Sequence, residues 1–268
     1  MDLKILTRLA IKASLIAGKE IITIYKTKDF SITLKEDNSP LTLADKNSHS
    51  KIVEVLKETE LPVLSEEGAE IPFETRKGWE YFWMVDPLDG TKEFINRNGE
   101  FTVNIALIHK NTPVLGVIYV PVTKDLYFGN TEIGAFKAIN ADSDSQFENL
   151  ESLLKMSFRL PFFIDDEVIT VVASKSHLTK DTSDYIDELK QSNGDVNIIS
   201  KGSSLKLCMV AEGTATIYPR FGPTMEWDIA AGHAIAVAAG CRVTLTDEKT
   251  PLVYNKEELL NPWFIVKR

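Results

Sequence analysis

The sequence predicts an α+β fold, and three patterns of apolar residues carry that prediction. Apolar side chains recur at helical spacing over residues 3–25 and 42–60, which indicates two amphipathic helices. Four short apolar segments over 101–138 are separated by turn residues, as in an antiparallel meander of strands. From residue 167 onward helical and strand patterns alternate, which is typical of helices packed on a mixed sheet.

The first half of the chain begins with the two helices. Leu3 and Leu6 start the buried stripe of the first helix. Thr42 is the expected N-cap of the second, because Ser39 and Pro40 interrupt the segment before it. The sequence also predicts strands within 27–36 and at 61–64, 81–85, 101–108, 114–120, 126–129 and 135–138.

The middle of the chain carries the predicted boundary between two lobes. Residues 140–151 are acidic, contain serine and are poor in apolar side chains, so we expect an exposed loop. The lobes would then span 1–145 and 146–268. In the second lobe, strands are expected at 167–173, 196–199, 214–218, 241–245 and 263–266, with helices at 180–191, 203–212 and 227–239.

Composition limits the classes of function. The 268-residue chain has a net charge of −9 and a pI near 5.1, which argues against a nucleic-acid-binding surface. A phosphate site in such a chain needs metal ions and locally placed Lys or Arg. The two cysteines, Cys208 and Cys241, lie in apolar segments and are expected to be reduced. No signal peptide or apolar run of membrane-spanning length is present, so we expect a cytoplasmic protein, with peripheral association at the inner face of the cell membrane left open.

The segment that ends the apolar run at 81–85 indicates a cation site. Asp86 and Asp89 are separated by Pro87, which is expected to stop the strand and turn the chain. Two close carboxylates repel each other unless a cation lies between them, and Mg²⁺ prefers such oxygen ligands. Gly90 and Thr91 follow and begin a short helix suited to an anion. An acidic turn that merely caps a helix is the alternative at this stage.

Three other positions offer acids or anion-binding groups. Glu66 follows the strand at 61–64, so a second strand ends in acids. Asp45 and Asp228 each fall in the first turn of a predicted helix, where a capping role is the simpler interpretation of either residue alone. Gly202-Ser-Ser-Leu-Lys206 places hydroxyl groups and a lysine at the start of a helix, which suits an anion.

Two segments resemble the signatures of the inositol monophosphatase superfamily. Trp83-Met-Val-Asp-Pro-Leu-Asp-Gly-Thr91 is similar to the first signature and Glu226-Trp-Asp-Ile-Ala-Ala-Gly232 to the second. Leu64-Ser-Glu-Glu67 resembles the metal loop between them. The order and spacing of these segments cover essentially the whole chain. The resemblance implies a layered α/β/α/β/α sandwich of the inositol monophosphatase and fructose-1,6-bisphosphatase type.

The residues after the first signature resemble one branch of that superfamily. Inositol monophosphatases tend to continue Asp-Gly-Thr-Thr-Asn-Phe, whereas this chain reads Asp-Gly-Thr-Lys-Glu-Phe over 89–94. Residues 90–107 and Val172-Ala-Ser-Lys-Ser-His177 resemble the bacterial CysQ type of 3′(2′),5′-bisphosphate nucleotidase. That branch implies Mg²⁺-dependent hydrolysis of the 3′-phosphate of adenosine 3′,5′-bisphosphate to AMP and phosphate, with a role in sulfur metabolism, sensitivity to Li⁺ and a monomeric or homodimeric state.

The resemblance assigns roles residue by residue. The ligands of two or three Mg²⁺ ions would be Glu66, Asp86, Asp89, Asp228 and the Leu88 carbonyl. Gly90 and Thr91 would hold the scissile phosphate, and Asp45 would pair with Thr91 to orient or deprotonate the attacking water. Glu66 would also act in catalysis and Asp228 would also contact the substrate. The nucleotide would be contacted by Ser174, His177, Ser203, Lys206 and Arg220.

Elementary chemistry agrees with these roles, since phosphoryl transfer needs chiefly positioning and charge neutralisation, and metal ions lower the pKa of bound water. Two alternatives stay open: an inositol- or sugar-phosphate phosphatase, and a metal- or nucleotide-binding protein without turnover.

Overall fold

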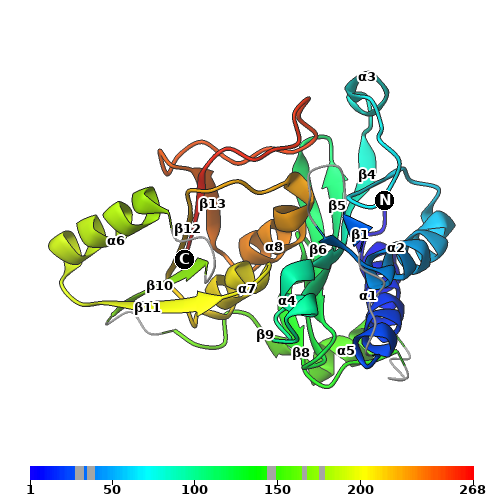
Figure 1. Ribbon diagram of the computed structural model, residues 1–268, viewed down its shortest axis with the longest axis horizontal. Coiled ribbons are helices and arrows are strands. Elements are labelled where there is room, and N and C mark those ends of the chain that lie inside the picture. The colour runs from blue at the N-terminus through cyan, green and yellow to red at the C-terminus, as the bar shows by residue number, and fades with distance from the viewer. Residues whose placement is uncertain (28–32, 35–39, 144–148, 165–167, 175–178) are drawn as a thin grey trace.

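The computed structural model describes residues 1–27, 33–34, 40–143, 149–164, 168–174 and 179–268. Its elements stack in five layers, which follow one another from right to left in Figure 1. Helices α1 (Leu3–Tyr25) and α2 (Leu43–Leu56) cover a seven-stranded sheet, and α7 (Leu205–Glu212) and α8 (Glu226–Ala238) lie on its other face. A five-stranded sheet and α6 (Lys180–Asn193) complete the stack. The α/β/α/β/α sandwich implied by the resemblance is confirmed.

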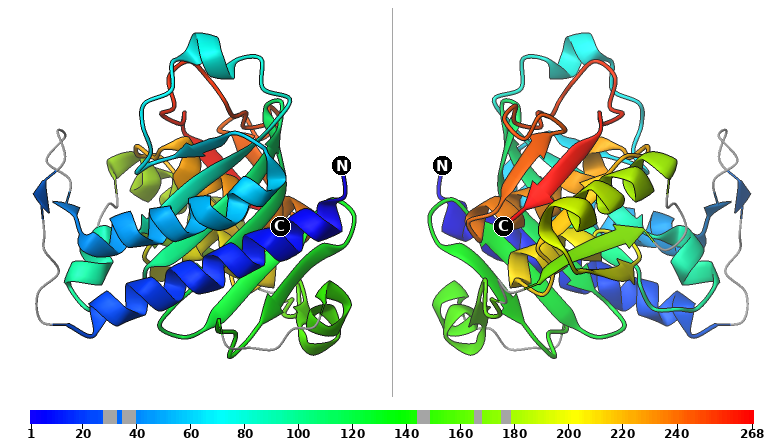
Figure 2. Two further views of the ribbon diagram at one scale, coloured as in Figure 1. Left: turned by 90° about the vertical axis from the view of Figure 1, so that its right-hand side faces the viewer. Right: turned by 90° about the vertical axis from the view of Figure 1, so that its left-hand side faces the viewer.

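The seven-stranded sheet is the larger of the two main sheets. Its strands, in spatial order, are β3 (Val63–Ser65), β4 (Tyr81–Asp89), β5 (Thr102–His109), β6 (Thr112–Val120), β7 (Asp125–Asn130), β8 (Gly134–Ala138) and β9 (Phe158–Arg159). Among these described strands, only β3 and β4 run parallel. Figure 2 shows α1 and α2 crossing one face of this sheet. Both faces are buried: Trp83 packs toward α1 and α2, while Phe82 and Met84 join the core on the α8 side. An apolar run without alternation is the expected signature of such a strand.

The second sheet is mixed, as the alternating patterns predicted. Its order is β11 (Val196–Lys201), β10 (Ile169–Ser174), β12 (Ile217–Arg220), β14 (Phe264–Lys267) and β13 (Arg242–Leu245). Strand β10 runs parallel to both neighbours, whereas β14 runs antiparallel to β12 and β13. Within the described residues, no helix combines the length and apolar character needed to cross a membrane.

Small residues allow α8 to lie close to the first sheet. A Cβ atom added to Gly116 of β6 would stand 2.1 Å from the carbonyl oxygen of Ala231. A Cβ added to Gly232 would meet the Leu207 side chain of α7 at 2.7 Å. The alanine-rich sequence of α8 therefore reflects tight packing on two sides, and this packing fixes the helix that carries Asp228.

The structure corrects several sequence-based expectations. The chain does not turn away at Pro87: β4 continues to Asp89 through an irregularity in its pairing with β5 between Asp86 and Asp89. Proline is tolerated there because a bulge interrupts the hydrogen-bond ladder. Helices α3 (Phe73–Arg76) and α5 (Leu150–Met156) were missed. Strand β9 pairs with β8, so the first sheet extends beyond the proposed division after residue 145.

Candidate metal and phosphate site

Two parallel strands deliver the first two acids to one edge of the sheet. Ser65 of β3 is paired with Val85 of β4, and the Glu66 N–H donates to the Val85 carbonyl at 3.1 Å. Glu66, directly after β3, and Asp86, within β4, therefore lie at the same level of the sheet. The Ser48 hydroxyl of α2 donates to the Pro87 carbonyl at 2.6 Å and so fixes the bulge that follows Asp86.

The third acid comes from the start of α8. Side-chain oxygens of Glu66, Asp86 and Asp228 lie within 4.8 Å of one another. One Asp228 oxygen, Oδ2, accepts from the Met225 N–H at 2.9 Å, so Asp228 caps its helix as the simpler interpretation expected. No described residue donates to its other oxygen. A single aspartate thus serves the helix with one oxygen and faces the acid cluster with the other.

The acid cluster is electrostatically costly without a cation. Burial and the nearby Glu66, Asp89 and Asp228 raise the pKa of Asp86 well above its ordinary value. Burial, Asp89 and Glu66 likewise raise the pKa of Asp228. One buried and two half-buried carboxylates that converge in this way have the donor chemistry of a Mg²⁺ site, because hard oxygen ligands and negative charge match a divalent cation. The residues present fit the metal that the sequence implied.

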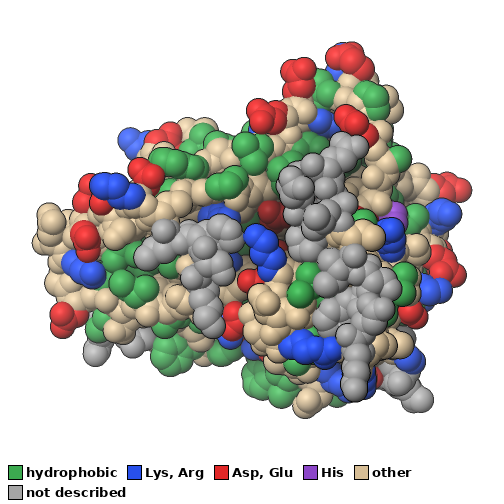
Figure 3. Space-filling view, in the orientation of Figure 1, with side chains coloured by type: hydrophobic (Ala, Val, Ile, Leu, Met, Phe, Trp, Pro, Cys, Tyr) green, Lys and Arg blue, Asp and Glu red, His purple; other side chains and the backbone are tan. Residues whose placement is uncertain are grey.

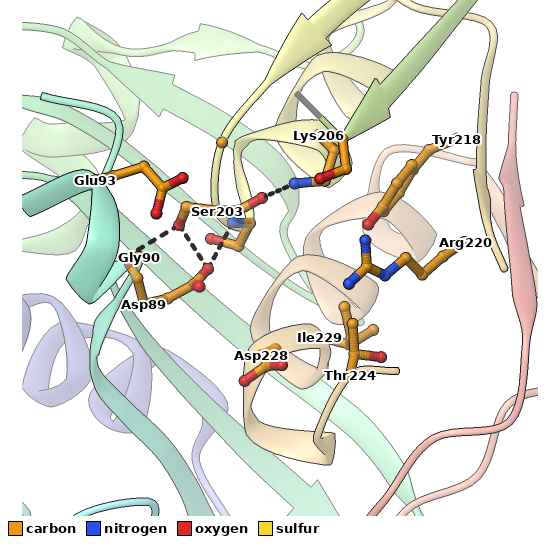
Figure 4. A pocket seen from close by; sticks show the side chains of 13 residues that line it. Asp89, Gly90, Glu93, Ser203, Lys206, Tyr218, Arg220, Thr224, Asp228 and Ile229 are labelled. Atoms are coloured by element: carbon orange, nitrogen blue, oxygen red, sulfur yellow. Dashed lines mark hydrogen bonds between the residues drawn. The ribbon is translucent and has the colours of Figure 1, made fainter. Parts of the chain in front are cut away.

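Asp89 lies at the end of β4 and is turned toward α7. Its Oδ2 accepts from the Ser203 hydroxyl at 2.5 Å and from the Ser204 N–H at 2.6 Å (Figure 4). No described residue donates to its Oδ1. Gly90 follows with a φ of +90°, a left-handed conformation that favours glycine, and precedes α4 (Thr91–Ile95).

Asp45 combines the two roles that the sequence left open. Its Oδ2 accepts from the Thr42 N–H at 2.7 Å and from the Thr42 hydroxyl at 2.6 Å, which completes a capping box at the start of α2. Its Oδ1 accepts from the Thr91 hydroxyl at 3.3 Å. That hydroxyl also lies 3.4 Å from the Leu88 carbonyl, the backbone group expected to bind metal. The capping carboxylate is therefore also the partner of Thr91.

A cavity opens beside Asp89 and Asp228 and has cationic groups in its wall. Figure 4 shows Lys206 and Arg220 on the side of the cavity away from Asp89. Burial lowers the pKa of Lys206 to about 8, while its Nζ donates to the Ser203 carbonyl at 2.5 Å. The Nε of Arg220 is buried and has no hydrogen-bond partner among the described residues. In Figure 3, acidic atoms lie at the bottom of a hollow near the middle of the molecule, with Lys and Arg side chains beside it.

The cavity gathers most of the predicted contacts and adds new ones. Gly90, Ser174 and Ser203 line it as expected, whereas His177 falls outside the described residues. Four further lining residues were given no role from the sequence, namely Glu93, Tyr218, Thr224 and Ile229, and Gly202 and Ser204 were noted only as part of the segment suited to an anion. Glu93 was used only to distinguish the branch of the superfamily. Its position three residues after Gly90 in a short helix indicates that it faces the same side of the helix as Gly90.

Comparison with known proteins identifies the family to which the chain belongs. The family model described as "Inositol monophosphatase family" matches residues 2–263. The chain belongs to the inositol monophosphatase family. Among inositol monophosphatase structures, one from Anabaena (Nostoc) superposes with a TM-score of 0.71 at 24% identity, covers 100% of this chain and 92% of that one, and shows a shared fold.

More similar relatives within the family carry the name CysQ. The 3′(2′),5′-bisphosphate nucleotidase CysQ of Salmonella typhimurium is 44% identical over 253 residues, covering 93% of this chain and 94% of that protein. The crystal structure of CysQ from Bacteroides thetaiotaomicron, described as a bacterial member of the inositol monophosphatase family, superposes with a TM-score of 0.91 at 52% identity. It covers 98% of this chain and 97% of that one.

Proposed function

We propose that this chain is a Mg²⁺-dependent phosphatase that hydrolyses the 3′-phosphate of adenosine 3′,5′-bisphosphate to give AMP and phosphate. Relatives at 44% and 52% identity are named as CysQ, and the first of them as a 3′(2′),5′-bisphosphate nucleotidase. Mg²⁺ would be held by Glu66, Asp86, Asp89, Asp228 and the Leu88 carbonyl. The recycled product would serve sulfur metabolism, as the resemblance implies.

One observation carries the choice of substrate: the cavity has two ends of opposite charge. Figure 4 shows Asp89 at one end, Lys206 and Arg220 on the side away from it, and Asp228 between them at the lower edge. A substrate with two phosphates matches both ends, one phosphate at the acids through a cation and the other at the two basic side chains. A monophosphate such as inositol monophosphate would leave Lys206 and Arg220 without an anionic partner.

The chain's own residues would supply orientation and proton handling. Bound Mg²⁺ supplies charge neutralisation and makes a hydroxide nucleophile available near neutral pH. Thr91, held by Asp45, would orient the attacking water, and Asp45 would accept its proton through the threonine hydroxyl. Gly90 and Thr91 would hold the scissile phosphate. Ser174, His177, Ser203, Lys206 and Arg220 would hold the rest of the nucleotide.

A substrate panel tests this proposal. Phosphate release is measured from adenosine 3′,5′-bisphosphate, adenosine 2′,5′-bisphosphate, AMP and inositol monophosphate, each with Mg²⁺ and with EDTA. We expect kcat/KM for the 3′,5′-bisphosphate to exceed that for inositol monophosphate by at least about 100-fold, since a hydrogen bond to a charged group in a binding site is worth about 3 kcal/mol. A preference for inositol monophosphate would refute the nucleotidase assignment and leave the family membership intact. Binding without phosphate release would favour a protein that does not turn over.

The depressed pKa of Lys206 leads to a pH prediction. Because only the ammonium form attracts a phosphate, kcat/KM is expected to fall above pH 8, approaching tenfold per pH unit. Because kcat/KM reports the free enzyme, this fall follows the pKa of Lys206 in the unliganded protein, which burial lowers below that of an ordinary lysine. Rates are measured from pH 6.5 to 9.5 at fixed free Mg²⁺.

Lys206→Met provides the control for that profile. Methionine keeps much of the length and loses the charge, so KM should be raised at every pH and the limb above pH 8 should disappear. If kcat/KM of the variant still fell above pH 8, the group that titrates there would not be Lys206.

A further inference from the structure

We propose that Thr102, Asn104 and Ser204 form a positioning network that couples Asp89, one of the proposed metal ligands, to the substrate-binding helix α7. The network consists of the polar side chains of these three residues, which lie between β5 and the start of α7. It rests on the proposed function, because it concerns how that site is held. Thr102 and Asn104 were not recognised from the sequence, and Ser204 was noted only as part of a segment suited to an anion.

The contacts converge on one carboxylate oxygen. Asp89 Oδ2 accepts from the Ser203 hydroxyl, from the Ser204 N–H and, at 3.4 Å, from the Asn104 amide. Thr102 Oγ1 lies 2.7 Å from the Ser203 hydroxyl, 2.8 Å from the Ser204 hydroxyl and 2.9 Å from Asn104 Oδ1. The Ser204 hydroxyl donates to Asn104 Oδ1 at 2.9 Å. Thr102 is therefore the point where the contacts meet.

The proton count is consistent with a directed network. Ser203 gives its only hydroxyl proton to Asp89, and Ser204 gives its own to Asn104. Thr102 has one proton for three neighbouring oxygens, so it donates to one of them and can accept from another only if that hydroxyl turns away from its present acceptor. Asn104 Oδ1 can only accept, so Thr102 donates to it, and the donors then run in series through the Asn104 amide to the Asp89 carboxylate, where each bond strengthens the next.

Burying these three polar side chains costs free energy of folding unless they find hydrogen-bond partners. Thr102 and Asn104 are fully buried, and Ser204 is 2% exposed. In β5 the even-numbered residues share one face, and the next two, Ala106 and Ile108, belong to the apolar core beneath α8. Apolar side chains could fill the same face without any need for partners. Polar groups on this face are therefore placed where β5 passes Asp89, the position at which they find partners.

The network joins the two functions of the cavity. Asp89 belongs to the proposed metal ligands, while Ser203 and Lys206 stand at the start of α7 on the substrate side. Hydrogen bonds to Oδ2 set the rotation of the Asp89 carboxylate and so direct Oδ1, to which no described residue donates a hydrogen bond. The same bonds hold the first turn of α7 against the end of β4. Removal of the network should therefore weaken metal binding and substrate binding together.

Thr102→Val and Thr102→Ser form a matched pair for the test. Valine has the shape of threonine and lacks the hydroxyl, whereas serine keeps the hydroxyl and lacks the methyl group. Two experiments are made. Thermal unfolding without substrate gives the Mg²⁺ midpoint, which is the Mg²⁺ concentration at half of the metal-induced rise in melting temperature. Steady-state kinetics at saturating Mg²⁺ give KM and kcat for adenosine 3′,5′-bisphosphate.

We expect Thr102→Val to raise the Mg²⁺ midpoint and KM by about tenfold each, the usual size of an effect on residues that orient metal ligands, while kcat changes less. Thr102→Ser, which keeps the hydroxyl, should leave the Mg²⁺ midpoint and KM within about threefold of the wild-type values. Ser204→Ala, which removes one donor to Asn104, should shift both in the same direction by a smaller factor.

Two results would overturn the inference. One is a Thr102→Val protein with an unchanged Mg²⁺ midpoint and KM. The other is equal impairment of the valine and serine variants, which would assign the effect to packing of the methyl group. The Mg²⁺ midpoint needs no substrate, so a wild-type protein inactive on the bisphosphate would refute the proposed function without affecting this arm.

Discussion

Asp86→Asn should remove phosphatase activity while making the metal-free protein more stable. We expect kcat/KM to fall on the order of 10³-fold, which corresponds to about 4 kcal/mol of transition-state stabilisation that a metal ligand supplies. Asparagine preserves the shape of the side chain, and its carbonyl oxygen can still accept the Leu88 N–H that Asp86 Oδ1 accepts at 3.0 Å. The substitution would therefore remove a negative charge without changing the local fold.

The gain in stability follows from the same electrostatics. Asp86 is 1% exposed and faces Glu66, Asp89 and Asp228, so its charge is both desolvated and repelled. A neutral amide removes both effects. We expect a gain of about 1–2 kcal/mol without metal, since residues at functional sites are commonly kept at a cost to stability. Wild-type protein should overtake the variant once Mg²⁺ is added.

Thermal unfolding with EDTA and with increasing Mg²⁺ measures this crossover. Asp187→Asn is the matched control, because Asp187 is an exposed carboxylate of α6 that pairs with Lys190 at 3.1 Å. It should leave activity and both melting curves almost unchanged. Intact Mg²⁺-dependent activity in Asp86→Asn would contradict the metal site as assigned, and a lower melting temperature in EDTA would show that Asp86 is needed for folding.

The layered fold could be predicted because most elements carry strong local patterns. The stripe of α1 and the apolar run of β4 both appear in the structure at nearly the expected residues. Helix α5 was missed because its apolar positions, among them Leu150 and Leu153, follow directly on a polar, serine-containing segment. Pro87 misled the prediction, since local chemistry favours a stop, whereas pairing with β5 resumes at Asp89 opposite Thr102 and keeps the strand going.

Some residues of the site could be found from local sequence patterns, and others only from tertiary contacts. Glu66 and Asp86 could be found because each follows its own apolar strand, and parallel pairing then brings them together. Thr102 and Asn104 could not be assigned, because polar residues within a strand pattern normally face solvent. Their role depends on hydrogen bonds with the start of α7, which lies about a hundred residues away in the chain. A strand buried on both faces that still carries polar side chains is the signal to seek.

Asp45→Asn should separate turnover from metal binding. Asp45 contacts the acid cluster through Thr91, whose hydroxyl donates to Oδ1 at 3.3 Å, and it is not one of the three acids that lie within 4.8 Å of one another. As an amide it can no longer take a proton. We expect kcat to fall by about 10²–10³-fold, the range for removal of a general base, while the Mg²⁺ midpoint changes less than about threefold.

The capping role of Asp45 requires its own control, because Oδ2 also accepts from Thr42. Thr42→Ala removes the capping hydroxyl and leaves Thr91 untouched, so it should lower stability by about 1 kcal/mol and keep kcat within about threefold. Steady-state kinetics and thermal unfolding of both variants over a Mg²⁺ series separate the two effects. Equal losses of turnover and Mg²⁺ affinity in Asp45→Asn would make Asp45 a structural support of the metal site. A selective loss of turnover would establish that a helix cap also serves as the base.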